Sequence, residues 1–222
     1  MASLFYLVYV ADFLVVSYLL FAFKGYFSNK IFIFLSTYCA ANSLANTANV
    51  FTPSLYSYTA SVFTVVEFIL FSSIIAQFVS SSSFRKMIAH CHWLFVMFVL
   101  VMHYFGSQGL VDSISIAVEC IFIFIFSFKY FFQEMNDVQL GFIYQKYHFW
   151  IIAGILIYLG GSFFFYLFAN HVEQSKANQF WSLTYIFYII KSLLFLFAIH
   201  VYRKNEKNKD ILNRSAHNYK LN

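Results

Sequence analysis

Four ionisable side chains stand inside long apolar runs of the sequence, where charge is costly and usually serves a purpose. They are Asp12, Glu67, Glu119 and Lys191. Three acids and one base cannot all pair, so at least one carboxyl group is expected to be protonated or reached by water. We predict that Lys191 pairs with a carboxylate, first with Glu67, and that Asp12 and Glu119 are the alternatives. Such a pair can serve a ligand or a proton, or it can fix helix packing alone.

Three asparagines recur at helical spacing in the second apolar run. Asn42, Asn46 and Asn49 stand at i, i+4 and i+7, which places them on one face of a helix. Amides are poor neighbours for lipid, so this face is expected to point into the protein. Two interpretations stay open: hydrogen bonds between helices, worth about 0.6–2 kcal/mol each, or the wall of a water-filled pocket.

Two later apolar runs carry comparable polar stripes. The last run has Trp181, Thr184, Tyr188 and Lys191 at i, i+3, i+7 and i+10. The sixth run has Gly154, Tyr158, Gly161 and Ser162 on a similar face. The pair Gly160-Gly161 permits a kink or, more commonly, a close approach of two helices.

Known catalytic patterns do not occur in this chain. The seven histidines are scattered, and the sequence has neither the H-E-x-x-H metal motif nor the G-x-S-x-G nucleophile motif. The cysteines Cys39, Cys91 and Cys120 fall inside apolar runs and lack zinc-site spacing. We therefore expect no enzyme, no bound metal and no cofactor.

A lysine in the middle of the last apolar run also raises the possibility of a retinal photoreceptor. The Schiff base would form on Lys191, with Glu67 or Asp12 as its counterion. However, the third run lacks the Arg–aromatic–acid pattern of microbial rhodopsins, and Phe187 stands where those proteins have an Asp four residues before the lysine. This interpretation is disfavoured.

The composition shows what kind of scaffold must position these groups. Hydrophobic residues make up 61% of the 222 residues and charged residues 10%, against about 45–50% and 25% in soluble domains. Most of the chain must therefore lie in lipid. Seven runs have the roughly 20 apolar residues that a membrane-crossing helix needs. They are residues 3–23, 31–51, 59–79, 87–105, 113–132, 148–169 and 180–202.

Basic residues predict the orientation of this all-α, seven-helix transmembrane bundle. Twelve of the fourteen Lys and Arg residues fall on one side of the predicted membrane, whereas the other side has only Lys176 and Lys191 is inside a helix. Cytoplasmic loops carry the excess of positive charge, so we expect an outside N-terminus and a cytoplasmic C-terminus. Residues 1–202 would form the transmembrane domain and residues 203–222 a short basic tail. The net charge of +5 thus does not indicate nucleic-acid binding.

The intramembrane polar residues are biased toward the outer half of the predicted bundle. Those in the outer half are Asn46, Asn49, Glu67, Glu119, Thr184 and Tyr188, and Asp12 and Lys191 would form a floor at mid-depth. The inner half is nearly all Phe, Leu, Ile and Val. A channel would carry polar residues through its full depth. The pattern predicts instead a cup that opens outward over a closed apolar base.

Four segments of the chain are similar to a family of membrane proteins. Residues 58–68, 149–158, 161–164 and 180–183 resemble small, uncharacterised seven-helix integral membrane proteins of Bacteroidota. Genes of that family often lie beside those of sensor kinases, so the resemblance implies a role in signalling.

Three functional hypotheses follow from these observations. The first is a receptor-like sensor of the inner (cytoplasmic) membrane, whose cup binds a small molecule or a partner helix and which acts with a membrane-protein partner or as a homo-oligomer. The second is a small-solute or proton-coupled carrier with Glu67, Glu119 and Lys191 on its pathway. The third is a structural subunit of a membrane complex.

Overall fold

The computed structural model describes residues 2–22, 29–52, 54, 56–105, 108–136, 143–168 and 174–219. Within them the chain forms seven α-helices, one single-turn 3₁₀ helix (η3, Ile143–Gln145) and no strand. The α-helices are α1 (Ala2–Ala22), α2 (Lys30–Phe51), α3 (Tyr56–Phe78), α4 (Ser82–Phe105), α5 (Gln108–Asn136), α6 (Tyr147–Phe168) and α7 (Gln174–Tyr219). The predicted all-α class is confirmed. The predictions that involve Lys24, Lys220 and the side chains of Lys176 and Trp181 lie outside the described part of the chain.

Five of these helices contain segments long and apolar enough to cross a membrane: Tyr58–Phe78, Ser82–Phe105, Ser113–Asn136, Tyr147–Phe164 and Ser182–Asn208. This indicates a multi-pass membrane protein. In α1 the described apolar segment, Tyr6–Phe21, is shorter than the other five. The 22-residue α2 has the length of a span, but its Asn, Ser and Thr residues make it less apolar.

The last helix extends well past the apolar run that predicts it. α7 has 46 residues and ends at Tyr219, although the apolar run ends at residue 202. No Gly or Pro interrupts residues 174–219, and Lys, Arg and Glu are good helix formers. The boundary expected at residue 202 is therefore a change of polarity and not the end of a helix.

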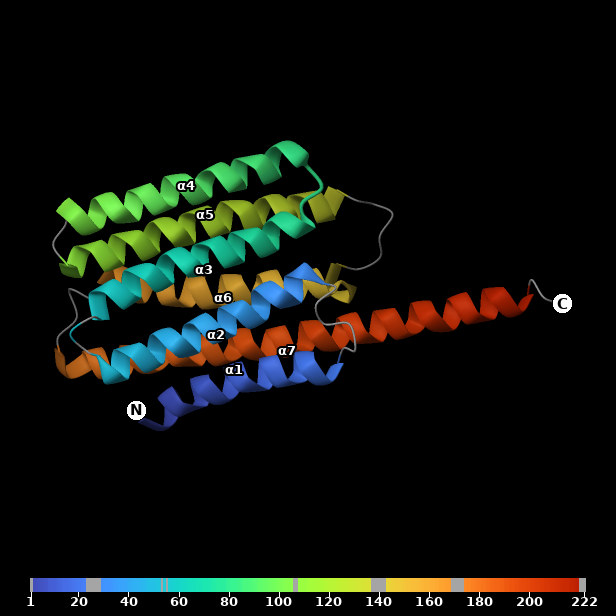
Figure 1. Cartoon of the computed structure of the whole chain (residues 1–222), viewed down its shortest axis with the longest axis horizontal. Helices are drawn as coiled ribbons and strands as arrows, with labels where there is room; N and C mark the ends of the chain where they lie inside the picture. The colour runs from blue at the N-terminus through green and yellow to red at the C-terminus, as the bar shows by residue number, and fades with distance from the viewer. Residues whose placement is uncertain are drawn as a thin grey trace.

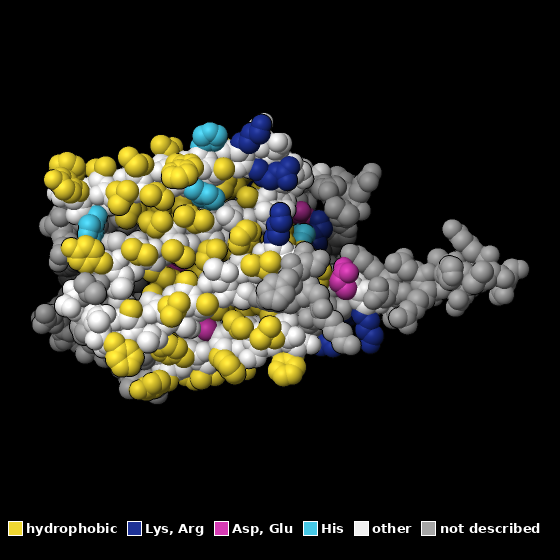
Figure 2. Space-filling view, viewed as in Figure 1, with side chains coloured by type: hydrophobic (Ala, Val, Ile, Leu, Met, Phe, Trp, Pro, Cys, Tyr) yellow, Lys and Arg dark blue, Asp and Glu magenta, His cyan; other side chains and the backbone are white. Residues whose placement is uncertain are grey.

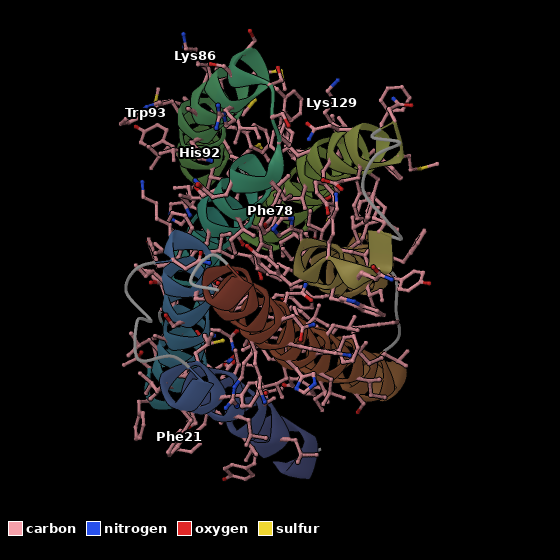
Figure 3. The ribbon with its side chains drawn as sticks, turned by 90° about the vertical axis from the view of Figure 1, so that its right-hand side faces the viewer. Phe21, Phe78, Lys86, His92, Trp93 and Lys129 are labelled. Atoms are coloured by element: carbon pink, nitrogen blue, oxygen red, sulfur yellow. The ribbon has the colours of Figure 1, made fainter. Side chains whose placement is uncertain are left out.

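Successive helices run antiparallel, and α7 projects beyond one end of the bundle (Figure 1). Below, this end is called the α7 end and the other the N-terminal end. Packing contacts join α1 to α2, α2 to α3, α3 to α5, α5 to α6, α6 to α7 and α7 back to α1, which closes a ring of six helices. α4 packs against α3 and α5 on the outside of that ring (Figure 3).

The surface of the bundle suits a lipid environment. Apolar side chains cover the helices along their length, whereas the exposed Lys and Arg side chains gather toward the α7 end (Figure 2). Trp93 of α4 and Phe21 of α1 point away from the bundle with 75% and 90% of their surface exposed (Figure 3). Phe78, by contrast, points into the bundle interior.

Aromatic packing closes the α7 end of the ring. Phe32 packs edge-on against Tyr202 with ring centroids 5.0 Å apart. Tyr147 contacts Tyr202 at 4.8 Å and Phe78 at 6.0 Å. These rings come from α2, α3, α6 and α7, so this end of the interior is filled by aromatic side chains.

Candidate functional site

A cavity of about 360 Å³ lies inside the helix ring, in the half of the bundle nearer the N-terminal end. We call it the polar cavity. Its wall combines side chains of α1, α2, α3, α5, α6 and α7. Seven of the ten predicted site residues line it: Asn42, Asn46, Asn49, Glu67, Tyr158, Thr184 and Tyr188. The structure thus brings these seven residues together around one cavity.

The asparagine stripe of α2 faces this cavity, as its spacing predicts. Asn42 is buried, Asn46 and Asn49 are half-buried, and all three line the wall. On the other side of α2, Leu44 and Phe51 are 70% and 79% exposed. The amides therefore face inward because the opposite face of the helix meets the apolar surroundings.

Asp12 of α1 lies directly behind the floor of the cavity and joins three helices. Its Oδ2 accepts hydrogen bonds from Asn42 Nδ2 at 2.9 Å and Ser43 Oγ at 3.2 Å. Its Oδ1 accepts one from the Tyr188 hydroxyl of α7. Asp12 is only 3% exposed, so these donors replace the water that a buried carboxylate loses. Asp12 also borders a second hollow, of about 350 Å³, between α1 and α2.

Lys191 is connected to Glu67 through the hydroxyl of Tyr38. The Lys191 ammonium donates to the Tyr38 oxygen, and the Tyr38 hydroxyl donates to Glu67 Oε1 at 2.9 Å. Tyr158 also hydrogen-bonds to the Glu67 carboxyl group. Among the described residues there is one direct ion pair, between Lys146 and Glu134 near the α7 end, and Lys191 is not part of it. Lys191 thus makes no direct ion pair with a carboxylate among the described residues, and Tyr38 bridges it to Glu67, the partner predicted first.

Three tyrosine rings enclose the Lys191 ammonium. Its Nζ lies 3.5 Å from the ring centroid of Tyr188, 4.1 Å from that of Tyr158 and 4.2 Å from that of Tyr38. An ammonium over an aromatic face is stabilised by the ring quadrupole, by about 2 kcal/mol or more where water is excluded. Lys191 is 1% exposed and does not line the cavity. The predicted floor is thus formed by Glu67, Tyr158 and Tyr188, with Lys191 and Asp12 behind it.

Tyr38 is the functional residue that sequence reasoning missed. It precedes Asn42 by four residues, so it continues the asparagine stripe by one helical turn toward the α7 end. This four-residue spacing is the sequence signal that could have placed Tyr38 on the polar face of α2. A fully buried tyrosine needs a partner for its hydroxyl, and its place on the polar face of α2 supplies two.

Glu119 of α5 does not reach the cavity wall. Its side chain is fully buried, and neither carboxyl oxygen has a hydrogen-bond partner in the part of the chain that the structure describes. The hydroxyls of Ser115, one turn earlier on α5, and Ser162, on α6, are also buried without a partner. Glu119 is close enough to Glu67 for the two groups to interact electrostatically. The structure therefore separates the predicted acids into two that are hydrogen-bonded and one that is not.

The glycines of α6 allow close packing against α7. A Cβ atom on Gly161 would overlap the ring of Phe187, and one on Gly154 would lie 3.3 Å from Leu194 Cβ. This close approach brings Tyr158 of α6 to Tyr188 of α7, whose rings stand at 88° with centroids 5.7 Å apart. Of the two meanings predicted for the Gly160-Gly161 pair, close approach holds at Gly161.

The chain matches no protein-family model, no curated protein and no solved structure.

Proposed function

We propose that this protein is a receptor-like component of the inner (cytoplasmic) membrane that binds a small polar ligand in the polar cavity. In this proposal all seven helices cross the membrane, the N-terminal end of the bundle faces outward and α7 projects into the cytoplasm. α1 and α2 are included as spans because they complete the ring around the cavity.

The observation that carries the proposal is the contrast between the two halves of the ring. The half near the N-terminal end holds a cavity with amide, hydroxyl and carboxyl groups on its wall. The half near the α7 end is closed by Phe32, Phe78, Tyr147 and Tyr202. A ligand could enter such a site from one side but not pass through, which favours a receptor over a channel.

Signal output would pass through α7 to a membrane-protein partner. Tyr188 lines the cavity on the same helix that continues past the bundle to Tyr219. A helix transmits a displacement along its axis because its hydrogen-bonded turns are stiff, so a ligand that moves Tyr188 would also move the projecting segment. The resemblance to a family encoded beside sensor kinases agrees with such a partner.

Accessibility of single cysteines tests this proposal. The variants Asn46→Cys, on the cavity wall, and Leu44→Cys, on the opposite face of α2, are made in a Cys91→Ala background, since Cys91 is the native cysteine that is not buried. Whole cells are treated with a small, membrane-impermeant methanethiosulfonate reagent. We expect modification at position 46 and not at position 44. Modification at position 46 only after permeabilisation would reverse the orientation, and none at all would contradict an open cavity.

A proton-coupled carrier is the second candidate, and the connected buried groups favour it. Tyr188 and Asp12 form one hydrogen-bonded group, and Lys191, Tyr38 and Glu67 form another. The two groups meet where the Lys191 ammonium lies over the Tyr188 ring. A carrier would acidify or alkalinise the lumen of proteoliposomes when a substrate gradient is applied. A receptor would leave the internal pH unchanged.

A further inference from the structure

We propose that the ligand of the polar cavity is a small organic cation, an amine whose ammonium group binds at Glu67. This inference rests on the proposed ligand-binding role and specifies the chemistry of the ligand.

The first argument is the sign of the charge that faces the cavity. Among the described residues that line the wall, Glu67 has the one acidic side chain, and none has a basic side chain. Lys191, the buried lysine among the residues with described side chains, lies behind the rings of Tyr158 and Tyr188. An anion entering the cavity would therefore meet a carboxyl group before it met a lysine, whereas a cation would meet its counter-charge directly.

The second argument is that Glu67 is held ready by its neighbours. It is 5% exposed and accepts hydrogen bonds from Tyr38 and Tyr158. A carboxylate has about four lone-pair sites, so two tyrosine donors leave room for the N–H groups of an ammonium. Since both tyrosine side chains are packed inside the ring of helices, they orient the Glu67 carboxyl group before any ligand arrives.

The third argument is the aromatic surface around Glu67. Tyr158, Tyr188 and Phe63 line the cavity together with this carboxyl group. The rings of Tyr158 and Tyr188 already attract one ammonium, that of Lys191, from behind the wall. Aromatic rings combined with a carboxylate are the chemistry by which proteins recognise amines.

The fourth argument is the balance of charge inside the bundle. Among the described residues, the two hydrogen-bonded carboxyl groups, those of Asp12 and Glu67, are buried with one lysine, Lys191. A bound cation would offset part of this excess of acid. The cavity volume of about 360 Å³ is near the lower end of the range of about 300–1,000 Å³ for small-molecule sites, so we infer a small amine and not a peptide.

Three probes of similar size and different charge test the inference. Benzylamine, benzyl alcohol and benzoate are each added to the detergent-purified full-length protein near neutral pH, and the thermal unfolding midpoint is followed against probe concentration. We expect benzylamine to raise the midpoint and benzoate to leave it unchanged. Glu67→Gln should weaken the apparent affinity for benzylamine by about tenfold or more, because a hydrogen-bonded counter-charge is lost. Glu119→Gln, the same chemical change away from the wall, should keep the wild-type response.

A second variant keeps the test valid if Glu67→Gln does not fold. Asn46→Phe fills the cavity without changing any charge, and it should reduce the benzylamine response. Leu44→Phe, on the opposite face of α2, should not. An equal response to all three probes, or a benzylamine response that survives Glu67→Gln, would overturn the cation inference and leave the ligand-binding cavity in place. If no probe acts while Asn46→Cys is still modified, the cation inference fails alone, and if that modification is also lost, the proposed function fails with it.

Discussion

The ammonium of Lys191 and the carboxyl group of Glu67 are joined through one atom, the hydroxyl oxygen of Tyr38, which accepts from the first and donates to the second at 2.9 Å. The three residues come from α7, α2 and α3, so this relay ties the last helix of the chain to two consecutive helices of its first half. Its geometry also implies that the two charged groups depend on Tyr38 for their coupling.

Replacing Tyr38 by Phe should destabilise the protein more than its loss of one oxygen atom suggests. Tyr38→Phe keeps the aromatic side chain but removes the hydroxyl that hydrogen-bonds to both Lys191 and Glu67. The cost of an unsatisfied buried polar group is about 1–3 kcal/mol, and more for a charged one. Thermal or chemical unfolding of the detergent-purified protein measures the change. Tyr104→Phe, at a position that is 83% exposed, is the matched control and should be nearly neutral, and equal effects of the two variants would contradict the relay.

Lys191 and Glu67 should be energetically coupled, and the coupling should pass through Tyr38. Lys191→Met and Glu67→Gln should each lower stability, by up to about 3–5 kcal/mol, whereas the double variant should recover much of the loss because no uncompensated charge remains. The same double-mutant cycle is then repeated in the Tyr38→Phe background, where the coupling energy should shrink. Strict additivity in the wild-type background would show that the two residues are not partners.

The sequence predicts the polar face of this site better than its connections. Helical spacing was enough to place Asn42, Asn46 and Asn49 on the cavity wall, because a helix face is a local property of the chain. The link between Lys191 and Glu67 depends instead on how side chains of α2, α3 and α7 meet inside the helix ring, which spacing within one helix does not contain. A lysine and a glutamate at similar depth therefore predict a direct pair, and Tyr38 is overlooked among 17 tyrosines.

The fold shows the same division between local and long-range information. Apolar runs located all seven helices, but polar residues at the ends hid the true lengths of several of them. α4 begins at Ser82 and not at residue 87, since Arg85 and Lys86 continue the helix with exposed side chains. The position of α4 outside the ring, and with it the exclusion of α4 from the cavity wall, depends on tertiary packing that hydropathy does not encode.

Asp12 and Glu119 should respond differently when each carboxyl group is replaced by an amide. Asp12 accepts three hydrogen bonds, so Asp12→Asn would turn one acceptor into a donor that faces existing donors, at a cost of about 1–3 kcal/mol. Glu119 has no hydrogen bond to lose among the described residues, and Glu119→Gln removes an ionisable group from an apolar site. We expect Asp12→Asn to lower the unfolding midpoint at neutral pH and Glu119→Gln to leave it unchanged or raise it. A strong loss of stability in Glu119→Gln would contradict this expectation. It would mean that the Glu119 carboxyl group has a stabilising partner in the protein.

The proposed orientation makes a prediction for reporter fusions. Exposed Lys and Arg side chains gather toward the α7 end (Figure 2), and positively charged residues are retained on the cytoplasmic side. A reporter that is active only in the cytoplasm should therefore work when fused after Asn222. The same reporter inserted at Gly109, near the start of α5, should be silent. The reverse pattern would place the polar cavity on the cytoplasmic side and would remove the basis for an external ligand.

Two adjacent glycines of α6 allow the packing of the cavity floor to be tested without touching a polar group. A Cβ on Gly161 would overlap the Phe187 ring, whereas the nearest atom to a Cβ on Gly160 is Phe124 Cζ at 3.6 Å, an ordinary contact. Gly161→Ala should therefore force α6 and α7 apart and cost about 1–3 kcal/mol, as overpacking in cores does. Gly160→Ala should be neutral or slightly stabilising, because alanine favours the helix by up to about 1 kcal/mol. α6 and α7 carry Tyr158 and Tyr188 of the cavity floor, so Gly161→Ala should also weaken benzylamine binding. A Gly161→Ala protein that loses stability but keeps full affinity for benzylamine would show that the cavity floor does not depend on this contact.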